Sequence, residues 1–561
     1  MHSRQRLRLV TPLITLCSVA LAAEVEAADC GANDGNELLA CIAQAAAGDT
    51  ITMAAGTFEI SGVTIANLHG TDTEPITLVG TVDGSGTLLS HVIGQSTGSN
   101  TIEIQHSSYL VFRDFELSHA AGATGNSVDL IKFTGAGEAS HHVTIEGLDV
   151  HDCGNVAISS QAEEIHHITV QDTTVHDIGG SCFYWGYYEN EQPQHQVHHS
   201  GIINNLLMRC PQSDSSETHY GIQLKSGNHD NRVEDNVLVD VGGTTRVGIA
   251  VYHNAPKPVG SPLEGSNVVR GNLVIRSRNE GINASAGAII ENNIVLDAAG
   301  IGIYLQPRSY GGVTYYGSLQ VRNNTVVQQD AAHAIRFTHA AWDHADSNRP
   351  TEFTGNLAIV ESGDGLRPPS ETATVADNAT NGNDNGAAAT ITLTDVLQAV
   401  VSNTFGDPNY LWPVAAGPLV DVGVDPAAQD DFNHTTRDGT PDVGAYEWIE
   451  ADNPGWTLAE DELKPEGGSS SGTGGNGTGG AGGSSSSGTG GSATGGSGTG
   501  NGGAGANSST SPDEESGCDC ATGPGTGSRS LPWPLLLPLL LWRRRSTGGS
   551  RDRSDSGIVL R

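Results

Sequence analysis

Short segments of alternating apolar and polar residues recur along the chain from about residue 100 to about residue 360. Most copies contain a strand-like run, a polar turn that often includes Asn, and a second strand-like run. From Val143 to Ile168 the spacing is 25 residues, and from Ile290 to Val321 it is 31. The clearest copies are 108–119, 142–152, 167–177, 231–240, 267–276, 288–297 and 319–328. Repeats of this length, made of strands without intervening helices, indicate a solenoid.

The strand period of two predicts an all-β fold, a right-handed parallel β-helix. Alternate Val, Ile and Leu side chains would point into the coil and stack on the next coil, because one coil cannot bury its apolar row alone. A β-sandwich is the alternative, but its strands would not repeat one motif coil after coil. Recurrent Asn at the bends is expected to take the left-handed backbone conformation and to hydrogen-bond the turn, as at Asn236, Asn272, Asn293 and Asn324.

The flanks of the repeat are predicted to be its caps. Residues 29–100 would hold a short N-terminal cap, with a helix near Asn36–Ala40 and opening coils at 48–58 and 70–78, and residues 101–450 would form the β-helix domain. The segment 441–448, Pro-Asp-Val-Gly-Ala-Tyr-Glu-Trp, resembles the closing segment of many bacterial surface β-helix proteins. We therefore expect it to cover an end of the stack, where open strand edges need protection.

The N-terminus predicts secretion. Arg4, Arg6 and Arg8 precede an apolar run that leads to small residues at 27–28, the order of a signal peptide over residues 1–28. In an oxidising compartment Cys30 and Cys41 would pair across the short helix. The remaining mid-chain cysteines, Cys153, Cys182 and Cys210, are odd in number, so at least one thiol there should be free or buried.

The C-terminus predicts a tether. Residues 451–517 are acidic and then rich in Gly and Ser, which is typical of a disordered, flexible linker. Residues 518–561 contain Cys518-Asp-Cys, a short hydrophobic run at 531–542 and an Arg cluster at 543–545. This order resembles the C-terminal sorting signal of myxobacterial surface proteins and implies attachment to the outer membrane. An ordinary membrane anchor, the alternative, would also leave the domain at the cell surface.

Charge and composition narrow the partners. The formal net charge of −37 argues against nucleic-acid binding, so an acidic ligand would need a local basic groove. We expect a monomer. The His pairs at 141–142, 166–167 and 198–199 recur with the repeat and lack zinc-ligand spacing, so they are interpreted as turn residues.

A further strand, often of the form Gly-Ile-x-apolar-x, accompanies many repeats. If its Ile points inward, the alternate residues line one outer face of the solenoid. Aromatic, amide and basic groups on such an extended face suit a sugar chain, whereas a merely solvated face would carry less Tyr. The expected row comprises Lys132, Ser159, Tyr184, Gln223, Lys225, Tyr252, Asn283, Tyr304, Gln306 and Arg336, with His253 next to Tyr252.

Two short motifs on consecutive coils, Lys225-Ser226 and Arg246-Val247-Gly248, resemble those of chondroitinase B and alginate lyase-type polysaccharide lyases. Those enzymes are right-handed β-helices that act on uronic-acid polymers. The resemblance implies β-elimination, with Lys225 as the base and Arg246 stabilising the developing enolate charge. His219, Tyr220, Tyr252 and His253 are alternative proton-transfer groups.

The same resemblance raises calcium as a cofactor, because such lyases often use Ca²⁺ to neutralise the substrate carboxylate. Asp214 and Glu217 are the nearest acids before Lys225 and hence the candidate ligands, although residues 218–224 carry no carboxylate. Lys225 could instead be a solvent-facing lysine, and Arg246 could buttress a loop against Glu217, Glu234 or Asp235.

Two other functions stay open at this point. A hydrolase would need two carboxylates across the scissile bond, for which Asp129, Asp149 and Asp152 are available. A non-catalytic adhesin would use the aromatic and amide row for binding alone. The leading hypothesis is a secreted, surface-tethered lyase acting on an acidic polysaccharide.

Overall fold

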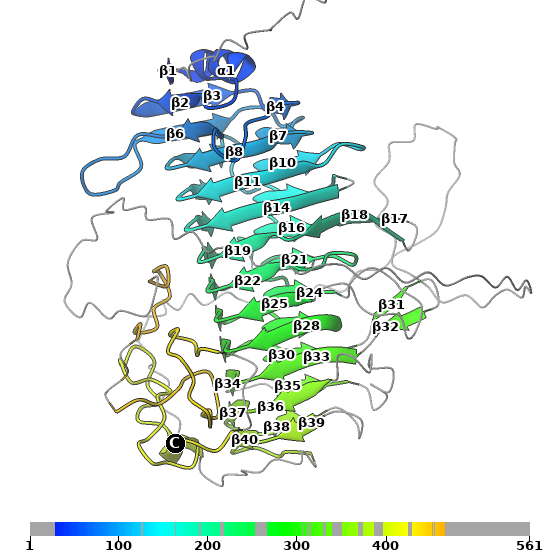
Figure 1. The fold of residues 1–561 in the computed structure, drawn as a ribbon, viewed down its shortest axis with the longest axis vertical. Coiled ribbons are helices and arrows are strands. Elements are labelled where there is room, and N and C mark those ends of the chain that lie inside the picture. The colour runs from blue at the N-terminus through cyan, green and yellow to red at the C-terminus, as the bar shows by residue number, and fades with distance from the viewer. Residues whose placement is uncertain are drawn as a thin grey trace, which may run out of the picture. The chain divides into compact units, whose positions relative to one another are not determined.

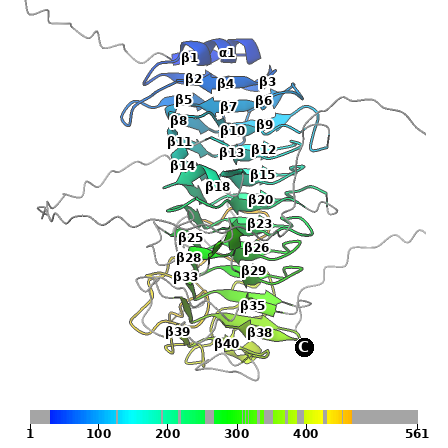
Figure 2. The same ribbon diagram turned by 90° about the vertical axis from the view of Figure 1, so that its right-hand side faces the viewer.

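Three parallel β-sheets wind around one apolar core in a computed structural model of the chain. The structure describes residues 29–465 except for 125–126, 163, 190–191, 214–217, 253–265, 307, 311–312, 316, 329–332, 339–350, 369–373, 386–395, 424–428, 451–452 and 454. Each coil contributes one strand to sheets A, B and C in turn, so that neighbours within a sheet come from successive coils (Figures 1 and 2). The predicted right-handed parallel β-helix is confirmed.

The strands of sheet A are β1 (Asp29–Ala32), β2 (Thr50–Met53), β5 (Ile76–Val79), β8 (Ser108–Arg113), β11 (Ser140–Glu146), β14 (Glu164–Gln171), β19 (Gly201–Ile203), β22 (Arg232–Glu234), β25 (Asn267–Arg270), β28 (Ala286–Glu291), β33 (Gly317–Arg322), β36 (Glu352–Thr354) and β39 (Thr374–Ala376), and β18 (Gln192–His198) joins β14 and the antiparallel β17 (Tyr187–Glu189). Sheet B contains β3 (Gly56–Ile60), β6 (Ser90–Gly94), β9 (Glu116–His119), β12 (Asp149–His151), β15 (Thr174–His176), β20 (Leu206–Met208), β23 (Val237–Val239), β26 (Leu273–Ile275), β29 (Ile294–Leu296), β34 (Thr325–Gln328), β37 (Leu357–Val360) and β40 (Ala379–Thr380). Sheet C contains β4 (Val63–Ala66), β7 (Ile102–Gln105), β10 (Ile131–Thr134), β13 (Ile158–Ser160), β16 (Phe183–Trp185), β21 (Ile222–Leu224), β24 (Ile249–Val251), β27 (Ile282–Ala284), β30 (Ile303–Leu305), β35 (His333–Phe337) and β38 (Asp364–Arg367). A separate hairpin pairs β31 (Arg308–Tyr310) with β32 (Val313–Tyr315).

Apolar side chains stack coil upon coil inside the solenoid, as the alternation predicts. In sheet C one inward column runs without exposure through Ile131, Ile158, Phe183, Ile222, Ile249, Ile282, Ile303 and Ile335. Because the strands pair in register, each side chain rests on the same position of the next coil, and a continuous core results. The opening coils expected at 48–58 and 70–78 supply β2, β3 and β5.

The recurrent Asn residues form a buried ladder between sheets A and B. Asn236 donates from Nδ2 to the Ile202 carbonyl at 2.8 Å and to Asn272 Oδ1 at 2.9 Å, and Asn293 and Asn324 continue the pattern. The predicted hydrogen bonding of the turn is thus confirmed. The predicted left-handed conformation is wrong for these residues, because the residue before each one adopts it, as at Asp235 with φ of 58°.

The N-terminal cap matches its prediction. Helix α1 (Gly35–Gln44) begins after Asp34, whose side chain accepts hydrogen bonds from the backbone N–H groups of Asn36 and Glu37. This N-cap satisfies donors that the first turn leaves open. The helix lies over the first coils, and the expected Cys30–Cys41 disulfide joins it to β1. The second disulfide links Cys182 to Cys210 and leaves Cys153 as a buried free thiol, whose pKa burial raises.

The C-terminal part of the described chain packs beside the solenoid (Figure 1). After the short 3-10 helix η1 (Val396–Ala399), the residues up to 465 bury Trp412, Phe432 and Tyr446 against the outer face of sheet B. The segment 441–448 therefore does not cover an end of the stack: the Ala445 N–H donates to Thr325 Oγ1 at the start of β34. The outward apolar residues of sheet B, such as Ile275 and Leu296, explain this position, because they would otherwise face water.

Several predicted segments, namely the signal peptide at 1–28, most of the linker and the sorting signal at 518–561, lie outside the described residues. Among the residues that are described, we find no helix of the length and apolar character needed to cross a membrane.

Candidate functional site

The outward row predicted on the Gly-Ile strands forms a straight line across sheet C. Strand pairing places Lys132, Ser159, Tyr184, Gln223, Ala250, Asn283, Tyr304 and Arg336 side by side in register. Lys225, Tyr252 and Gln306 follow two residues later, just past the ends of β21, β24 and β30. Their inward neighbours lock the strands into the core, so this face is held rigidly by the stack.

A pocket of about 410 Å³ opens on this face over β21, β24 and β27. Its lining residues are Tyr220, Gln223, Lys225, Thr245, Arg246, Val247, Tyr252, Asn279, Glu280, Asn283 and Gln306. Seven of them are site residues predicted from the sequence, namely Tyr220, Gln223, Lys225, Arg246, Tyr252, Asn283 and Gln306. The pocket thus brings together side chains from successive coils.

Two buried amides belong to the pocket lining. Gln223 is 0% exposed and Asn283 is 2% exposed. Within the described residues, neither Oε1 nor Nε2 of Gln223 has a hydrogen-bond partner, and Asn283 Oδ1 also has none. A buried polar atom without a partner costs about 1–3 kcal/mol, so most such atoms in proteins are paired. Hydroxyl groups of a bound ligand would supply the missing partners.

Cationic and aromatic side chains make up much of the remaining wall. Lys225 Nζ lies 4.8 Å from the centroid of the Tyr184 ring, which comes from the neighbouring strand β16. Arg246 Cζ lies 5.8 Å from the centroid of the Tyr220 ring. Arg246 also donates from Nη1 to the carbonyl and the hydroxyl oxygen of Thr245. Both cations are therefore positioned by contacts within the site itself.

Two tyrosine hydroxyls meet in the same wall. The Tyr220 and Tyr252 oxygens are 3.2 Å apart, and either hydroxyl can be the donor. Both residues are more than nine-tenths buried. His219, the other described proton-transfer candidate, does not line the pocket, and partial burial lowers its pKa.

The acids suggested as partners for Arg246 bind elsewhere. Glu234 pairs with Arg232, and Asp235 pairs with Lys464, whose Nζ lies 2.5 Å from Asp235 Oδ1. The buttressing interpretation therefore fails for these two acids. Glu217 lies outside the described residues, as do Asp214 and His253.

Five described residues of the predicted row lie outside the pocket lining, namely Lys132, Ser159, Tyr184, Tyr304 and Arg336. Lys132 is on β10, three strands away from β21, and its Nζ lies 3.2 Å from Oδ2 of the buried Asp129. Tyr304 and Arg336 continue the row past Asn283 on β30 and β35. Lys132 thus has a structural partner, whereas Tyr304 and Arg336 extend the face along the solenoid.

Sequence reasoning missed Glu280, Asn279 and Thr245 as lining residues. Glu280 directly precedes Gly281-Ile282, and Tyr220 and Val247 hold the same position before Gly221-Ile222 and Gly248-Ile249. The signal was therefore present in the repeat, because the residue before each of these three Gly-Ile motifs lines the same pocket. Among the described lining residues Glu280 is the single carboxylate.

Two groups of described side chains could hold a metal ion, and both lie away from the pocket. One contains His91, Glu116 and His151 on neighbouring strands of sheet B. The other contains His142, His166 and His167 on β11 and β14 of sheet A. The His pairs 141–142 and 166–167, interpreted from the sequence as turn residues, lie within β11 and β14, whereas the pair 198–199 stands at the end of β18.

Comparisons with known proteins give the following likenesses. Residues 168–345, about a third of the chain, match the model of a family described as periplasmic copper-binding protein (NosD). No curated protein matches the chain. Among solved structures, the pectate lyase Pel9A is 14% identical with a TM-score of 0.40, and the match covers 73% of this chain and 90% of that one. An alginate lyase from Paenibacillus sp. str. FPU-7 is 16% identical with a TM-score of 0.34, covering 62% of this chain and 97% of that one. XylC, solved with xylose, is 10% identical with a TM-score of 0.44, covering 74% of this chain and 95% of that one.

Proposed function

We propose that the pocket binds an acidic polysaccharide and cleaves it by β-elimination next to a uronate. The observation that carries this proposal is that Lys225 and Arg246, from successive coils, line one pocket together with the buried amides of Gln223 and Asn283. The described lining contains two cationic side chains, Lys225 and Arg246, and one carboxylate, Glu280. This local excess of positive charge favours an anionic ligand, although the whole chain is negatively charged. A hydrolase would need a second carboxylate among the described lining residues.

The side chains provide the groups for each part of the reaction. Arg246 pairs with the uronate carboxylate and offsets the negative charge that develops when the proton at C5 leaves. Lys225 Nζ, in its neutral form, takes that proton. The electron pair forms the C4–C5 double bond as the bond between C4 and the glycosidic oxygen breaks. The Tyr220–Tyr252 hydroxyl pair donates a proton to the departing oxygen.

The remaining lining residues would hold the sugar ring. Gln223 and Asn283 offer unpaired amide atoms to ring hydroxyls, and Tyr184 presents an aromatic face beside Lys225. Tyr304 and Arg336 lie farther along the same row, where neighbouring sugars of the chain would bind. Each occupied amide atom removes a desolvation cost that the empty pocket carries.

Calcium is not used in this scheme. Ca²⁺ takes about 6–8 oxygen ligands, and among the described lining residues Glu280 is the single carboxylate. Asp214 and Glu217 stay candidate ligands outside the described residues, and activity measured with and without EDTA tests them.

The test uses the full chain with alginate, pectate and glycosaminoglycans, and it follows ultraviolet absorbance of the unsaturated uronate product. Lys225→Arg keeps the positive charge but removes the base, so the rate should fall by about 10²–10⁴-fold while the polysaccharide still binds. Arg246→Ala should lower the rate by about 10²–10³-fold. The matched control is Arg367→Ala, an exposed arginine in the same row of sheet C, in register with Arg336.

The outcomes separate the hypotheses. Polysaccharide binding without absorbance gain across the panel would replace the lyase with the non-catalytic binding protein. Activity that survives Lys225→Arg would show that another group is the base.

We also propose that the protein is secreted and held at the cell surface. The two disulfides are typical of an oxidising compartment and support export. Protease treatment of intact cells tests the location: the full chain should be degraded at the surface, and a chain that ends at residue 517 should appear in the medium.

A further inference from the structure

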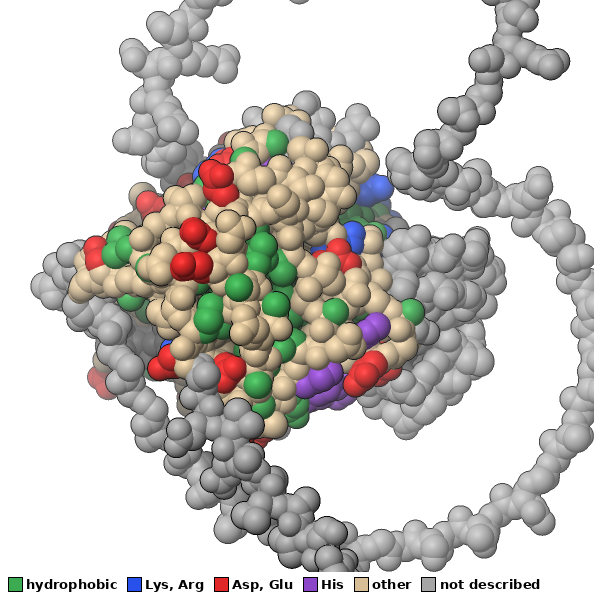
Figure 3. All heavy atoms as spheres, turned by 90° about the horizontal axis from the view of Figure 1, so that it is seen from above, with side chains coloured by type: hydrophobic (Ala, Val, Ile, Leu, Met, Phe, Trp, Pro, Cys, Tyr) green, Lys and Arg blue, Asp and Glu red, His purple; other side chains and the backbone are tan. Residues whose placement is uncertain are grey.

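Histidine side chains reach the outer surface of the solenoid, and in the view from above they gather at one place on its rim (Figure 3). Two groups of described side chains that contain histidine stand close enough to share a metal ion, one on sheet A and one on sheet B. Both lie apart from the proposed polysaccharide site on sheet C. They differ in where their nitrogen atoms point.

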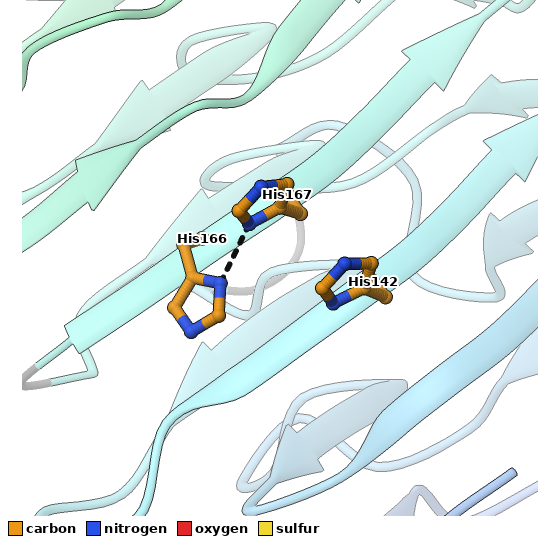
Figure 4. Close-up of side chains that lie close together, drawn as sticks. All are labelled: His142, His166 and His167. Carbon is orange, nitrogen blue, oxygen red and sulfur yellow. Dashed lines mark hydrogen bonds between the residues drawn. The ribbon is translucent and has the colours of Figure 1, made fainter. Parts of the chain in front are cut away.

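The imidazoles of the sheet A group bind one another. His142 and His167 have φ values of 53° and 57°, and this left-handed bend turns both members of the pairs 141–142 and 166–167 outward. The Nδ1 atoms of His166 and His167 are 2.7 Å apart in a hydrogen bond, and the rings of His142 and His167 stack with centroids 4.5 Å apart and planes 4° apart (Figure 4). Parallel rings direct their nitrogens along parallel lines, so these side chains do not surround one ion.

The sheet B group comes from three successive coils. His91 on β6 pairs in register with Glu116 on β9, and His151 on β12 follows one coil later. The flanking residues Val92 and Val150 are buried in the core, so the side chains of the group point outward, and all three are partly exposed. The parallel stack thus holds these side chains together, and solvent gives an ion access to them.

Two imidazole nitrogens approach the same carboxylate oxygen. Glu116 Oε1 lies 2.8 Å from His151 Nε2 and 3.4 Å from His91 Nδ1. One ligand atom from each of the three residues lies within 4.8 Å of the others. Two ligands bound at about 2.0–2.1 Å by a tetrahedral Zn²⁺ are about 3.3 Å apart, so the two oxygen–nitrogen distances lie on either side of the required value. Two histidines and one carboxylate leave the fourth position of such an ion to water.

The second nitrogen of each imidazole has a partner of its own. His91 Nε2 lies 2.7 Å from Ser118 Oγ, and His151 Nδ1 lies 3.0 Å from Asp152 Oδ2. Such outer partners fix the tautomer and the orientation of a metal-binding histidine. With a proton on His91 Nε2 and another on His151 Nδ1, the lone pairs of His91 Nδ1 and His151 Nε2 both face Glu116.

The protonation of the neighbouring histidines separates this group from the next coil. Burial lowers the pKa of His91 against the charge of Glu116 and other nearby carboxylates, and neutral imidazole is the form that binds metal ions. His176 behaves differently: although burial opposes it, hydrogen bonds with Asp149 and Asp177 raise its pKa. A proton on His176 therefore competes with a metal ion, and His151 is the last ligand of the group.

We propose that His91, Glu116 and His151 bind one Zn²⁺ ion, which joins three successive coils across the outer face of sheet B. The contact between His151 Nε2 and Glu116 Oε1 needs a shared proton when no ion is bound, and the ion takes the place of that proton. Binding therefore releases a proton and weakens as the pH falls. All three ligands lie outside residues 168–345, the segment that matches the copper-binding family model.

The test is a Zn²⁺ titration of the full chain, purified without a poly-histidine tag and stripped with EDTA. Calorimetry gives the stoichiometry and the Kd, and the visible spectrum of Co²⁺ bound in place of Zn²⁺ reports the coordination geometry. We expect one tightly bound ion, a tetrahedral Co²⁺ spectrum, and a higher midpoint of thermal unfolding when Zn²⁺ is present.

Three variants probe the site itself. His151→Gln and Glu116→Gln should each raise the Kd at least about tenfold, because each replaces a ligand by a weaker donor. Asp152→Asn should raise the Kd by about tenfold, because it removes the carboxylate that orients His151 without removing a ligand.

Two matched variants control for other sites. His166→Gln removes a member of the sheet A group, and His106→Gln removes an imidazole that belongs to neither group. Both should bind Zn²⁺ within about twofold of the unchanged chain.

A loss of binding in His166→Gln but not in His151→Gln overturns the proposal, as does equal affinity in all variants or an octahedral Co²⁺ spectrum. If His151→Gln or Glu116→Gln does not fold, as judged by circular dichroism, Asp152→Asn and the Co²⁺ spectrum of the unchanged chain decide instead. An unchanged Kd in Asp152→Asn then overturns the proposal.

Discussion

Gln223 provides the sharpest test of the pocket, because its amide costs stability in the protein without ligand. The side chain is 0% exposed, and both amide atoms lack hydrogen-bond partners within the described residues. Each such atom costs about 1–3 kcal/mol, so Gln223→Met, which keeps the size of the side chain, should stabilise the protein by about 2 kcal/mol. The same change should weaken polysaccharide binding by at least about tenfold, because the ligand hydroxyls lose their partner.

The matched control is a buried amide on the same coil whose atoms are all paired. Asn236 Nδ2 donates to the Ile202 carbonyl and Asn272 Oδ1, and Asn236 Oδ1 accepts from the Asn205 N–H and Nδ2. Asn236→Leu removes these hydrogen bonds and leaves their buried partner groups unsatisfied, so it should destabilise the protein by about 4 kcal/mol. Two buried amides are therefore expected to respond with opposite signs.

The assay is a thermal melt of both variants beside the unchanged chain, with polysaccharide affinity measured at a temperature where all are folded. A repeat protein need not unfold in one step, so only midpoints recorded under identical conditions are compared. A lower midpoint for Gln223→Met would show that its amide is already satisfied in the folded protein. Unchanged polysaccharide affinity would remove Gln223 from the binding site.

Three further changes probe the interactions outside the pocket. Lys132→Met should lower the free energy of unfolding by about 3 kcal/mol, because it leaves the buried Asp129 carboxylate without its cation. Chemical denaturation measures this loss, and polysaccharide affinity per folded molecule shows separately whether Lys132 also binds the ligand. Burial alone would raise the pKa of Asp235, but the charge of Lys464 lowers it to about 2. The ionised Asp235 therefore adds about 2 kcal/mol to the free energy of unfolding above pH 4, and this stabilisation is lost as the pH falls toward 2. In Asp235→Asn, the midpoint of thermal unfolding should consequently depend less on pH below pH 4. The thiol of Cys153 is buried, so peptide mass spectrometry should find it alkylated only after unfolding; alkylation of the folded protein would contradict its placement.

The solenoid was predictable because its signal is local and repeated. Each coil carries the same alternation, and Ile222, Ile249 and Ile282 stack where that alternation places them. The outward row followed from the same periodicity, so Gln223 and Asn283 were assigned to one face from the sequence. Parallel pairing in register converts a one-dimensional repeat directly into a three-dimensional column.

The different surroundings of the side chains in that row could be assigned only from the structure. Lys132 and Lys225 are both lysines on sheet C, but Lys132 is bound to a buried carboxylate and Lys225 faces Tyr184 in a pocket. Asp129 is visible in the sequence three residues before Lys132, yet its carboxylate is buried and accepts hydrogen bonds from Asn155 and Ser159 of the following coil. The pocket wall formed by Glu280 depends likewise on the turns that lead into each strand.

The sequence alone determined that this chain winds into a parallel β-helix with one polar and aromatic face, because stacking apolar rows is the way such short strands can bury them. Tertiary structure decided which side chains on that face meet. The left-handed bends at His142 and His167 turn two neighbouring imidazoles to the same side, a choice that residue spacing does not reveal. The lysine and arginine predicted as a catalytic pair line one pocket because β21, which ends just before Lys225, pairs with β24, which begins shortly after Arg246. Backbone pairing between coils sets this arrangement, rather than either residue.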